Sequence, residues 1–464
     1  MCIHPVLVSI LASIVWQSEG HVSRAPKFST KAGAAAVSIT PTIGTPMAGY
    51  YFERKSEGVH DDLFAKAIVL DHGGVRAALV SLDLISTSSG MVEDARAEVE
   101  RTTKVSGRNV MISATHAHTG PILTGRGSRD AEFGGKNPLT QAYNAELPKK
   151  IAEAVRQAEA KLNDAQILAA RGKESGIAFN RRFHMKDGTV GWNPGKLNPK
   201  ILKPAGPIDP DVDIVFIKSA AKDAAPLAAY VNHAVHLDNV GGEQFSADMP
   251  ATVSRLLGEV MGSGMMTCYT SGCCGDINHI NVKWAEPQKG FANAERMGII
   301  LAGTVLKTWP NLRPIAPGPL AVKSTTVLLP IPKVTPDEVS RATEIVERHR
   351  AQSKNPPSFL DAVWGYRVLD TESRQGKPIP VEVQVITMGT DLAWVSLPGE
   401  IFVELGLSIK QDSPFKQTTI AELANGAIGY IPTLRAYTQG NYEVVSARCA
   451  EGSGEMLVDA AIKL

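Results

Sequence analysis

Short runs of apolar residues, separated by Gly, Asp and His, recur along the first half of the chain. They lie at residues 65–70, 77–82, 110–112 and 214–217, where Val, Ile, Leu and Ala predominate. Aliphatic runs of this length bounded by turn residues are typical of strands. The pattern therefore predicts a strand at each of these four positions.

Apolar residues at helical spacing occupy residues 91–103 and 147–162. A third helix is indicated by its start, where Thr335 suits the N-cap, Pro336 the first helical position and Glu338 the capping box. This helix is expected to reach about Arg350. Strands alternating with helices indicate the α/β class.

Residues 313–319, rich in Pro, are the best candidate for a domain boundary. Because strand-like segments resume directly after them, we interpret them as a loop within one large domain, residues 30–464. The Pro- and Gly-rich residues 192–210 are interpreted as a long ordered loop that walls an active site.

Composition excludes several classes of protein. The 464 residues are 44% hydrophobic and 20% charged, with a formal net charge of +1, which is typical of a globular protein and gives no basic excess for nucleic acid. Residues 6–16 form an apolar run that fits a signal peptide over residues 1–20, and a buried first strand is the alternative. Export predicts a secreted or periplasmic protein. No later segment is apolar enough to span a membrane.

Four cysteines follow the expected leader, at positions 268, 273, 274 and 449. In an oxidising compartment, Cys273 or Cys274 could pair with Cys449. Buried free thiols are the equally good alternative, and none of the spacings is that of a zinc finger.

Two histidines stand at the end of one predicted strand. His116 and His118 are two residues apart, so in an extended backbone their side chains share one face. Imidazole is the commonest metal ligand, and the pair predicts a metal-activated hydrolytic centre. Structural histidines at a strand end are the alternative.

Four further places hold polar residues of catalytic type. His236 follows an apolar strand and is a second ligand candidate, while His233 is assigned to packing. Small residues at 270–279 allow close approach of the backbone to a ligand. Glu400 ends a strand and offers a hard ligand, and phenols gather near the carboxyl end at Tyr430 and Tyr442.

Six motifs taken in order resemble the neutral/alkaline (non-lysosomal) ceramidase family over nearly the whole chain. They are Thr115–Pro121, Asn180–Arg181, Ala234–His236, Gly275–Asn278, Pro398–Glu400 and Leu423–Glu443. The resemblance implies a mixed-sheet α/β catalytic domain with one zinc ion per chain. It implies zinc ligands at His116, His236, Glu400 and Tyr430. It further implies that His118 lines the site, that Arg181 contacts substrate, and that Tyr442 donates a hydrogen bond to the scissile carbonyl.

This chemistry is coherent, because zinc lowers the pKa of a bound water from about 15.7 towards 7 and so supplies a nucleophile for an amide carbonyl. Zinc and Tyr442 would stabilise the oxyanion, and His118 would relay a proton to the departing amine.

The chain departs from the family pattern in two ways. Asn278 stands where members usually carry Ser, so Asn278 is the candidate for the hydrogen bond that the hydroxyl would make. The carboxy-terminal immunoglobulin-like domain of the full-length ceramidases is also missing from this sequence. Both departures bear on the identity of the substrate.

The sequence is compatible with three functions. The first is a zinc-dependent amidohydrolase cleaving an N-acyl bond, with ceramide as the reference lipid and transient contact with membranes. The second is a zinc esterase or deacylase acting on a non-sphingolipid such as an acylated sugar. The third is a catalytically silent binding protein on the same scaffold, which the retention of four presumptive ligands disfavours. The sequence gives no oligomeric state.

Overall fold

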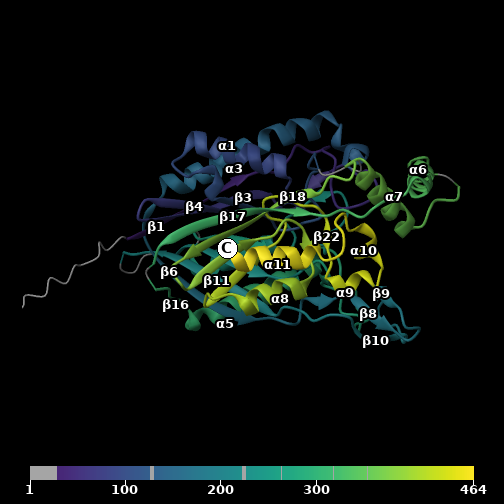
Figure 1. Ribbon diagram of the computed structural model, residues 1–464. Helices are drawn as coiled ribbons and strands as arrows, with labels where there is room; N and C mark the ends of the chain where they lie inside the picture. Colours follow the sequence, from purple (N-terminus) through teal and green to yellow (C-terminus); the bar gives the residue numbers. More distant parts are fainter. Residues whose placement is uncertain (1–28, 126–129, 222–225, 263, 317, 353) are drawn as a thin grey trace, which may run out of the picture.

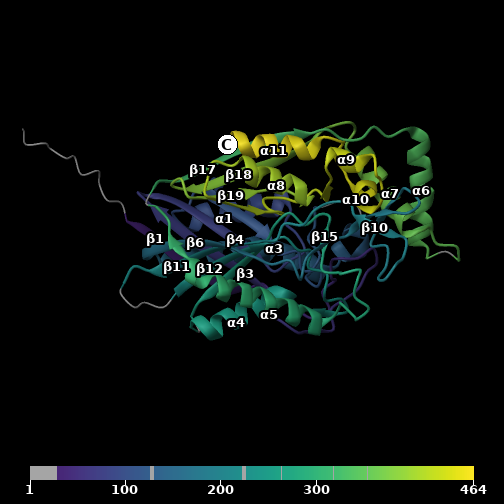
Figure 2. The same ribbon diagram turned by 90° about the horizontal axis from the view of Figure 1, so that it is seen from below.

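The computed structural model describes residues 29–464 except 126–129, 222–225, 263, 317 and 353. The predicted signal peptide, residues 1–20, lies outside the described residues. β-Sheets form the inside of the molecule and helices lie outside them (Figure 1; Figure 2). The α/β class predicted from the sequence is confirmed.

The largest sheet is mixed and has the order β14-β12-β11-β6-β1-β3-β4-β5, with β16 beside β6. Most neighbours are antiparallel, but β4 with β5 and β12 with β14 are parallel pairs. All four predicted strands belong to it. Its members are β1 (Thr30–Ser38), β3 (Phe64–His72), β4 (Val75–Leu82), β5 (Val110–Ala114), β6 (Asn163–Lys173), β11 (Asp211–Ser219), β12 (Pro226–His233), β14 (Met266–Ser271) and β16 (Arg313–Pro314).

A second sheet of four strands and several small sheets complete the β-structure. The second sheet has the order β17-β18-β19-β21. Its strands are β17 (Leu320–Leu329), β18 (Ile379–Met388), β19 (Leu392–Ser396) and β21 (Gln417–Ala421). The small sheets contain β2 (Gly58–Val59), β7 (Phe179–Asn180), β8 (Arg182–Met185), β9 (Val190–Trp192), β10 (Ile201–Pro204), β13 (Gln244–Phe245), β15 (Ile277–Asn278), β20 (Glu400–Ile401) and β22 (Tyr430–Ile431).

Alternating residues of the strands divide the apolar side chains between a central core and outer cores. In β3, Ile68 faces the central core and Val69 faces helices α1 and α3. In β12, Tyr230 faces the central core and Val231 the layer beneath α4 and α5. In β19, Trp394 faces the central core and Val395 faces the layer beneath α8 and α11. This period-2 pattern buries both faces of the strands in the four apolar runs, β3, β4, β5 and β11, which explains why those runs are continuous.

Helices cover the outer faces of the sheets, with α8 and α11 on one side of the molecule and α4 and α5 on the opposite side (Figure 2). The helices are α1 (Ser89–Thr102), α3 (Pro138–Ala160), α4 (Met249–Met261), α5 (Phe291–Thr308), α6 (Pro336–Arg350), α7 (Phe359–Glu372), α8 (Val403–Asp412), α9 (Leu434–Tyr437), α10 (Tyr442–Ser446) and α11 (Ser453–Lys463), with short turns η1 (Gly107–Asn109), η2 (Ala131–Gly135) and η3 (Trp309–Asn311).

Helix α6 starts and ends where the sequence predicts, and both hydrogen bonds of its capping box are present. Helix α3 was predicted to start too late. Asn137 caps it and Pro138 occupies its first turn, whereas Pro148 lies inside the helix. A proline inside a helix is uncommon and is more often found at its start, which explains the misplaced boundary.

The loop predicted at residues 192–210 is interrupted by a strand. These residues do not form one continuous loop, because β10 pairs with β8 within a three-stranded sheet.

The four described cysteines are buried free thiols. Of the two alternatives left open by the sequence, the structure therefore contains free thiols and no disulfide among the described residues. Cys274 Sγ instead donates a hydrogen bond to Glu422 Oε1 at 2.8 Å.

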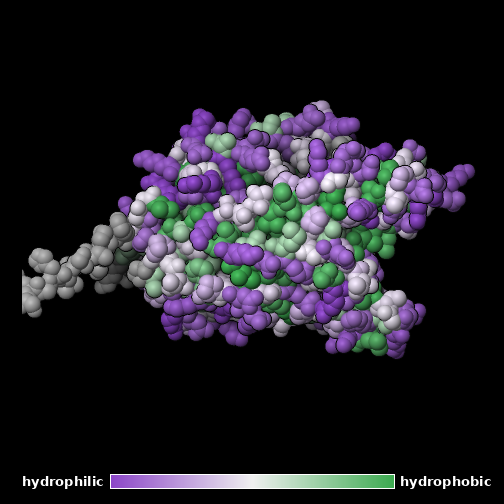
Figure 3. Space-filling view, in the orientation of Figure 1, coloured by the Kyte–Doolittle hydropathy of each residue, from purple (hydrophilic) through white to green (hydrophobic). Residues whose placement is uncertain are grey.

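Hydrophilic residues predominate on the face shown in Figure 3, with hydrophobic residues gathered mainly across its middle. Among the described residues, no helix combines the length and apolar character needed to cross a bilayer.

A buried ion cluster fixes α8 to the start of β11. Lys410 Nζ lies 2.7 Å from Asp209 Oδ2, 3.3 Å from Asp211 Oδ2 and 3.4 Å from Asp213 Oδ2. Burial raises the pKa of Asp211, but Lys410, Lys173 and Arg171 outweigh it and hold that pKa below its ordinary value. The cluster therefore stabilises the fold while these carboxylates are ionised.

Lys410→Met is expected to lower the free energy of unfolding by about 3 kcal/mol at pH 7, because it leaves buried carboxylates without their main partner. A depressed pKa contributes stability above the ordinary value of about 3.9 and loses it as pH falls below that value. Urea unfolding at pH 7 and pH 3 should therefore show a smaller difference from wild type at pH 3. An equal difference at both pH values would contradict an electrostatic role for Lys410.

Candidate metal centre

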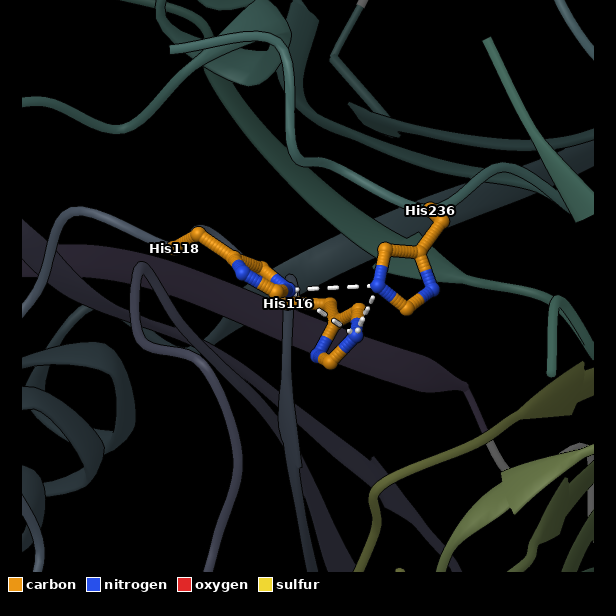
Figure 4. A group of neighbouring side chains, drawn as sticks. All are labelled: His116, His118 and His236. Carbon is orange, nitrogen blue, oxygen red and sulfur yellow. Dashed lines mark hydrogen bonds between the residues drawn. The ribbon is translucent and has the colours of Figure 1, made fainter. Parts of the chain in front are cut away.

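Three imidazoles point toward one another near the ends of β5 and β12 (Figure 4). His116 Nε2 lies 3.0 Å from His236 Nε2, and His118 Nε2 lies 3.2 Å from His236 Nε2 and 3.4 Å from His116 Nε2. His116 is 2% exposed and His236 4%. The structure thus brings together three residues that are predicted from two separate motifs.

The local backbone differs from the extended strand that the sequence suggested. Strand β5 ends at Ala114, and His116 has a φ of 73°, so His116 and His118 converge through a turn. The N–H of His116 donates to the carbonyl of Leu84 at 2.9 Å. Ser271 Oγ lies 3.4 Å from the carbonyl of Thr115 and 3.2 Å from that of Val235. This hydroxyl ties together the residues that immediately precede His116 and His236.

Burial favours the neutral, metal-binding form of two of the three histidines. His116 Nδ1 lies 2.6 Å from the carbonyl of Ile85, to which it can only donate, so Nε2 of the neutral ring carries a lone pair. Burial lowers the pKa of His118 to about 3 and that of His236 well below its ordinary value. At His116 the Glu400 carboxylate outweighs burial and raises the pKa above its ordinary value. Neutral imidazoles are the form that binds metal ions.

The distances also fit zinc. Four ligands about 2.0–2.1 Å from a tetrahedral ion lie about 3.3 Å from one another. The three Nε2 separations, 3.0, 3.2 and 3.4 Å, bracket this value. Converging lone pairs at such distances repel one another unless a cation lies between them. The three imidazoles could therefore surround a metal ion.

Glu400 and Tyr430 stand beside the histidines because β20 and β22 pair in parallel with these two residues in register. Glu400 Oε2 lies 3.5 Å from His116 Nε2, is shielded from solvent and has no hydrogen-bond partner among the described residues. Burial raises the pKa of Glu400, but interactions with His116, Tyr430 and Arg181 bring it down to about 2. An ionised, buried carboxylate with a free oxygen is an anionic ligand facing the same centre.

A close backbone approach sets the position of Glu400. A Cβ atom on Gly275 would lie 2.4 Å from the carbonyl oxygen of Glu400, and the N–H of Gly275 donates to Ile401 at 2.8 Å. Only glycine permits this contact. The small residues at 270–279 thus allow a close approach to the backbone of Glu400, a presumptive metal ligand.

Arg181 belongs to a buried ion cluster next to the tyrosines. Arg181 Nε lies 2.8 Å from Glu443 Oε1, and Arg182 Nη1 lies 2.8 Å from Glu443 Oε2. The Arg181 guanidinium stands 5.2 Å from the centre of the Tyr430 ring and 6.0 Å from that of Tyr442. Glu443 therefore fixes Arg181, and Arg181 in turn packs against both phenols.

Tyr442 lies at the start of α10, with its ring 5.3 Å from that of Tyr430 and 4.4 Å from that of Trp192. Asn278, predicted to make the hydrogen bond of the family's serine, is engaged with two loops. Its Nδ2 donates to Asn193 Oδ1 at 2.9 Å and its Oδ1 accepts from the N–H of Ile280 at 3.0 Å. The side-chain amide of Asn278 thus holds two neighbouring loops.

Sequence reasoning missed several residues around the site. Asp238 Oδ1 lies 3.8 Å from His118 Nδ1 and accepts a hydrogen bond from the Tyr50 hydroxyl at 3.1 Å. Asp238 follows His236 by two residues, which is the one signal available in the sequence. Arg182 and Glu443, by contrast, adjoin predicted residues and gave no signal of their own.

Comparison with known proteins gives a match at the level of structure. No protein-family model and no curated protein matches the sequence. The neutral ceramidase of Pseudomonas aeruginosa superposes with a TM-score of 0.73 over 94% of this chain and 74% of that chain, at 18% sequence identity. A structure described as a ceramidase complexed with C2 superposes with a TM-score of 0.72 over 94% of this chain and 75% of that chain, at 16% identity.

The chain has the neutral ceramidase fold. The resemblance inferred from six short motifs is thereby confirmed for the fold, although identity below one fifth leaves few residues in common. Within this neutral ceramidase fold, the buried His116, His118 and His236 group could hold a metal ion.

Proposed function

We propose that this protein is a secreted or periplasmic zinc-dependent amidohydrolase that cleaves an N-acyl bond, with ceramide as the reference substrate. The observation that carries the proposal is the convergence of three imidazoles beside the ionised carboxylate of Glu400, whose Oε2 lies 3.5 Å from His116 Nε2. The neutral ceramidase fold and the ceramidases that share it support the hydrolytic assignment.

We assign His116, His236, Glu400 and Tyr430 as the residues that would hold zinc. When bound there, zinc would polarise a carbonyl and lower the pKa of water. We assign His118 as the residue that passes a proton to the departing nitrogen from Nε2, with Asp238 Oδ1 3.8 Å from its Nδ1. The Tyr442 hydroxyl is assigned as the donor to the oxygen on which negative charge develops.

The packing of Arg181 on Tyr430 and Tyr442 keeps both phenols in place during the reaction. Because Glu443 neutralises much of the charge of Arg181, this guanidinium can remain buried next to the site. These residues therefore preorganise the site before substrate binds.

Hydrolysis of a short-chain fluorescent ceramide by the purified protein tests this function. Activity should disappear after chelation and return with zinc, and a matched ester should be measured in parallel. Chelator-resistant amide cleavage would overturn the zinc assignment, while zinc-dependent cleavage of the ester alone would favour an esterase.

His118→Ala separates a proton-transfer role from a ligand role. Removing His118 leaves four of the five donors around the centre, so we expect zinc to be retained at one ion per chain while kcat falls about 10²–10⁴-fold. Zinc content and kcat are measured on the same preparation. Loss of zinc from this variant would make His118 a ligand.

A further inference from the structure

A small polar cavity of about 50 Å³ adjoins the metal centre. Glu400, Tyr430 and Tyr442 line its inner side, so the cavity and the proposed catalytic centre share residues. Its outer wall comes from α7, which packs against α10 at the end of the molecule where α6 and α7 project (Figure 1). Tyr51, Tyr366, Arg367 and Arg448 complete this outer wall.

The two arginines in this cavity differ in their partners. Arg448 Nη2 and Nε lie 3.0 and 3.2 Å from Asp370 Oδ2, so the charge of Arg448 is compensated. Arg367 is partly buried, and its side chain makes no hydrogen bond or ion pair with any described residue. Its Nε atom is fully shielded from solvent. A guanidinium of intermediate exposure beside a cavity and without an ion pair is available to a bound anion.

Nearby carboxylates are already engaged with other groups. Glu338 Oε2 accepts hydrogen bonds from the Thr335 backbone at 2.8 Å and from its hydroxyl at 3.0 Å. Glu132 accepts from the Tyr366 hydroxyl at 2.7 Å and pairs with Arg350. Burial lowers the pKa of Arg367, and the charges of Glu338 and Tyr437 offset only part of that effect. The protein's own acids therefore do not satisfy Arg367.

We infer that Arg367 binds a carboxylate that the substrate carries within a few bonds of the scissile N-acyl group. This inference rests on the proposed function and narrows its substrate class to acidic N-acyl compounds. A guanidinium matches the planar, bidentate geometry of a carboxylate. About 50 Å³ of space for the centres of water-sized probes holds a few water molecules, which is room for a carboxylate.

The carboxylate can belong to either half of the substrate, and the test distinguishes the two cases. On the amine side, N-dodecanoylglycine is compared with N-dodecanoylethanolamine. On the acyl side, N-dodecylsuccinamic acid is compared with N-dodecylbutanamide. We expect one acid to exceed its neutral counterpart in kcat/KM by about 10- to 100-fold, the range of a hydrogen bond to a charged group.

The wild-type result alone can refute the inference. If both neutral amides are cleaved as well as or better than the acids, the carboxylate is not recognised, and the proposed amidohydrolase activity still stands. If none of the four amides and no ceramide is cleaved, the proposed function fails and this inference fails with it.

Variants test whether Arg367 is responsible for the preference for acidic over neutral amides. Arg367→Gln should reduce the acid-to-neutral ratio of kcat/KM about 10- to 100-fold, and Arg367→Lys should retain part of it. Arg341→Gln is the matched control, because this exposed arginine of α6 carries the same charge outside the cavity, and its ratio should equal that of wild type. Thermal unfolding verifies that each variant is folded. An unchanged ratio in folded Arg367→Gln, or in Arg367→Met should the glutamine variant not fold, would overturn the inference.

Discussion

His116→Ala is expected to lose its zinc and at least about a thousandfold in kcat/KM, because both depend on one nitrogen atom. His116 Nε2 lies 3.0 Å from His236 Nε2 and 3.5 Å from Glu400 Oε2, so it contacts both sides of the ligand set. Its orientation is fixed through Nδ1 by the carbonyl of Ile85. Zinc content per chain and ceramide hydrolysis are measured together on the dialysed variant.

His184→Ala is the matched control for this experiment. His184 lies on β8, is partly exposed and belongs to no group of potential metal ligands among the described residues. Its zinc content and kcat/KM should equal those of wild type. Full activity in His116→Ala would remove His116 from the centre, and full zinc with lost activity would restrict its role to the reaction.

Glu443→Gln is expected to lower the free energy of unfolding by about 3–5 kcal/mol, because two buried guanidinium groups lose their shared anion. Arg181, Arg182 and Glu443 have side chains only 5%, 2% and 0% exposed, so water cannot replace the lost charge. Urea unfolding of the metal-free protein measures this effect without a contribution from zinc binding. The activity of the folded fraction should also fall, since Arg181 packs against Tyr430 and Tyr442.

Glu404→Gln provides the comparison for an exposed pair. Glu404 bonds Arg435 at 2.8 Å, but the two side chains are 32% and 58% exposed. Water and salt screen such a pair, and we expect a loss below about 1 kcal/mol. Equal losses in the two variants would show that burial is not what makes Glu443 important.

Local signals in the sequence were sufficient for several elements. The capping box at Thr335 and Glu338 marks the start of α6, because both of its hydrogen bonds form within four residues. The four apolar runs predict strands because both faces of the sheets are buried. The motif residues His116, His236 and Glu400 meet in space because each follows or ends a strand.

Long-range contacts could not be predicted in this way. The sequence holds only 6% aromatic residues and shows no aromatic cluster. Yet Trp192 and Phe359 lie 5.9 Å apart and both stack near Tyr442, at 4.4 and 5.4 Å, although they come from three separate segments. The unpaired state of Arg367 is likewise a property of its surroundings, since an arginine on a helix usually reaches solvent or an acid.

The separation of α6 and α7 from the metal centre bears on how new specificities arise in this fold. The presumptive zinc ligands come from strands and from loops that follow strands, whereas Phe359, Tyr366 and Arg367 all come from α7. On the proposed function, mutations in α7 would change which molecules are hydrolysed while the presumptive metal ligands stay the same. Natural variation among homologues should accordingly concentrate in residues 336–372, and exchange of this segment offers a direct route to engineered substrate range.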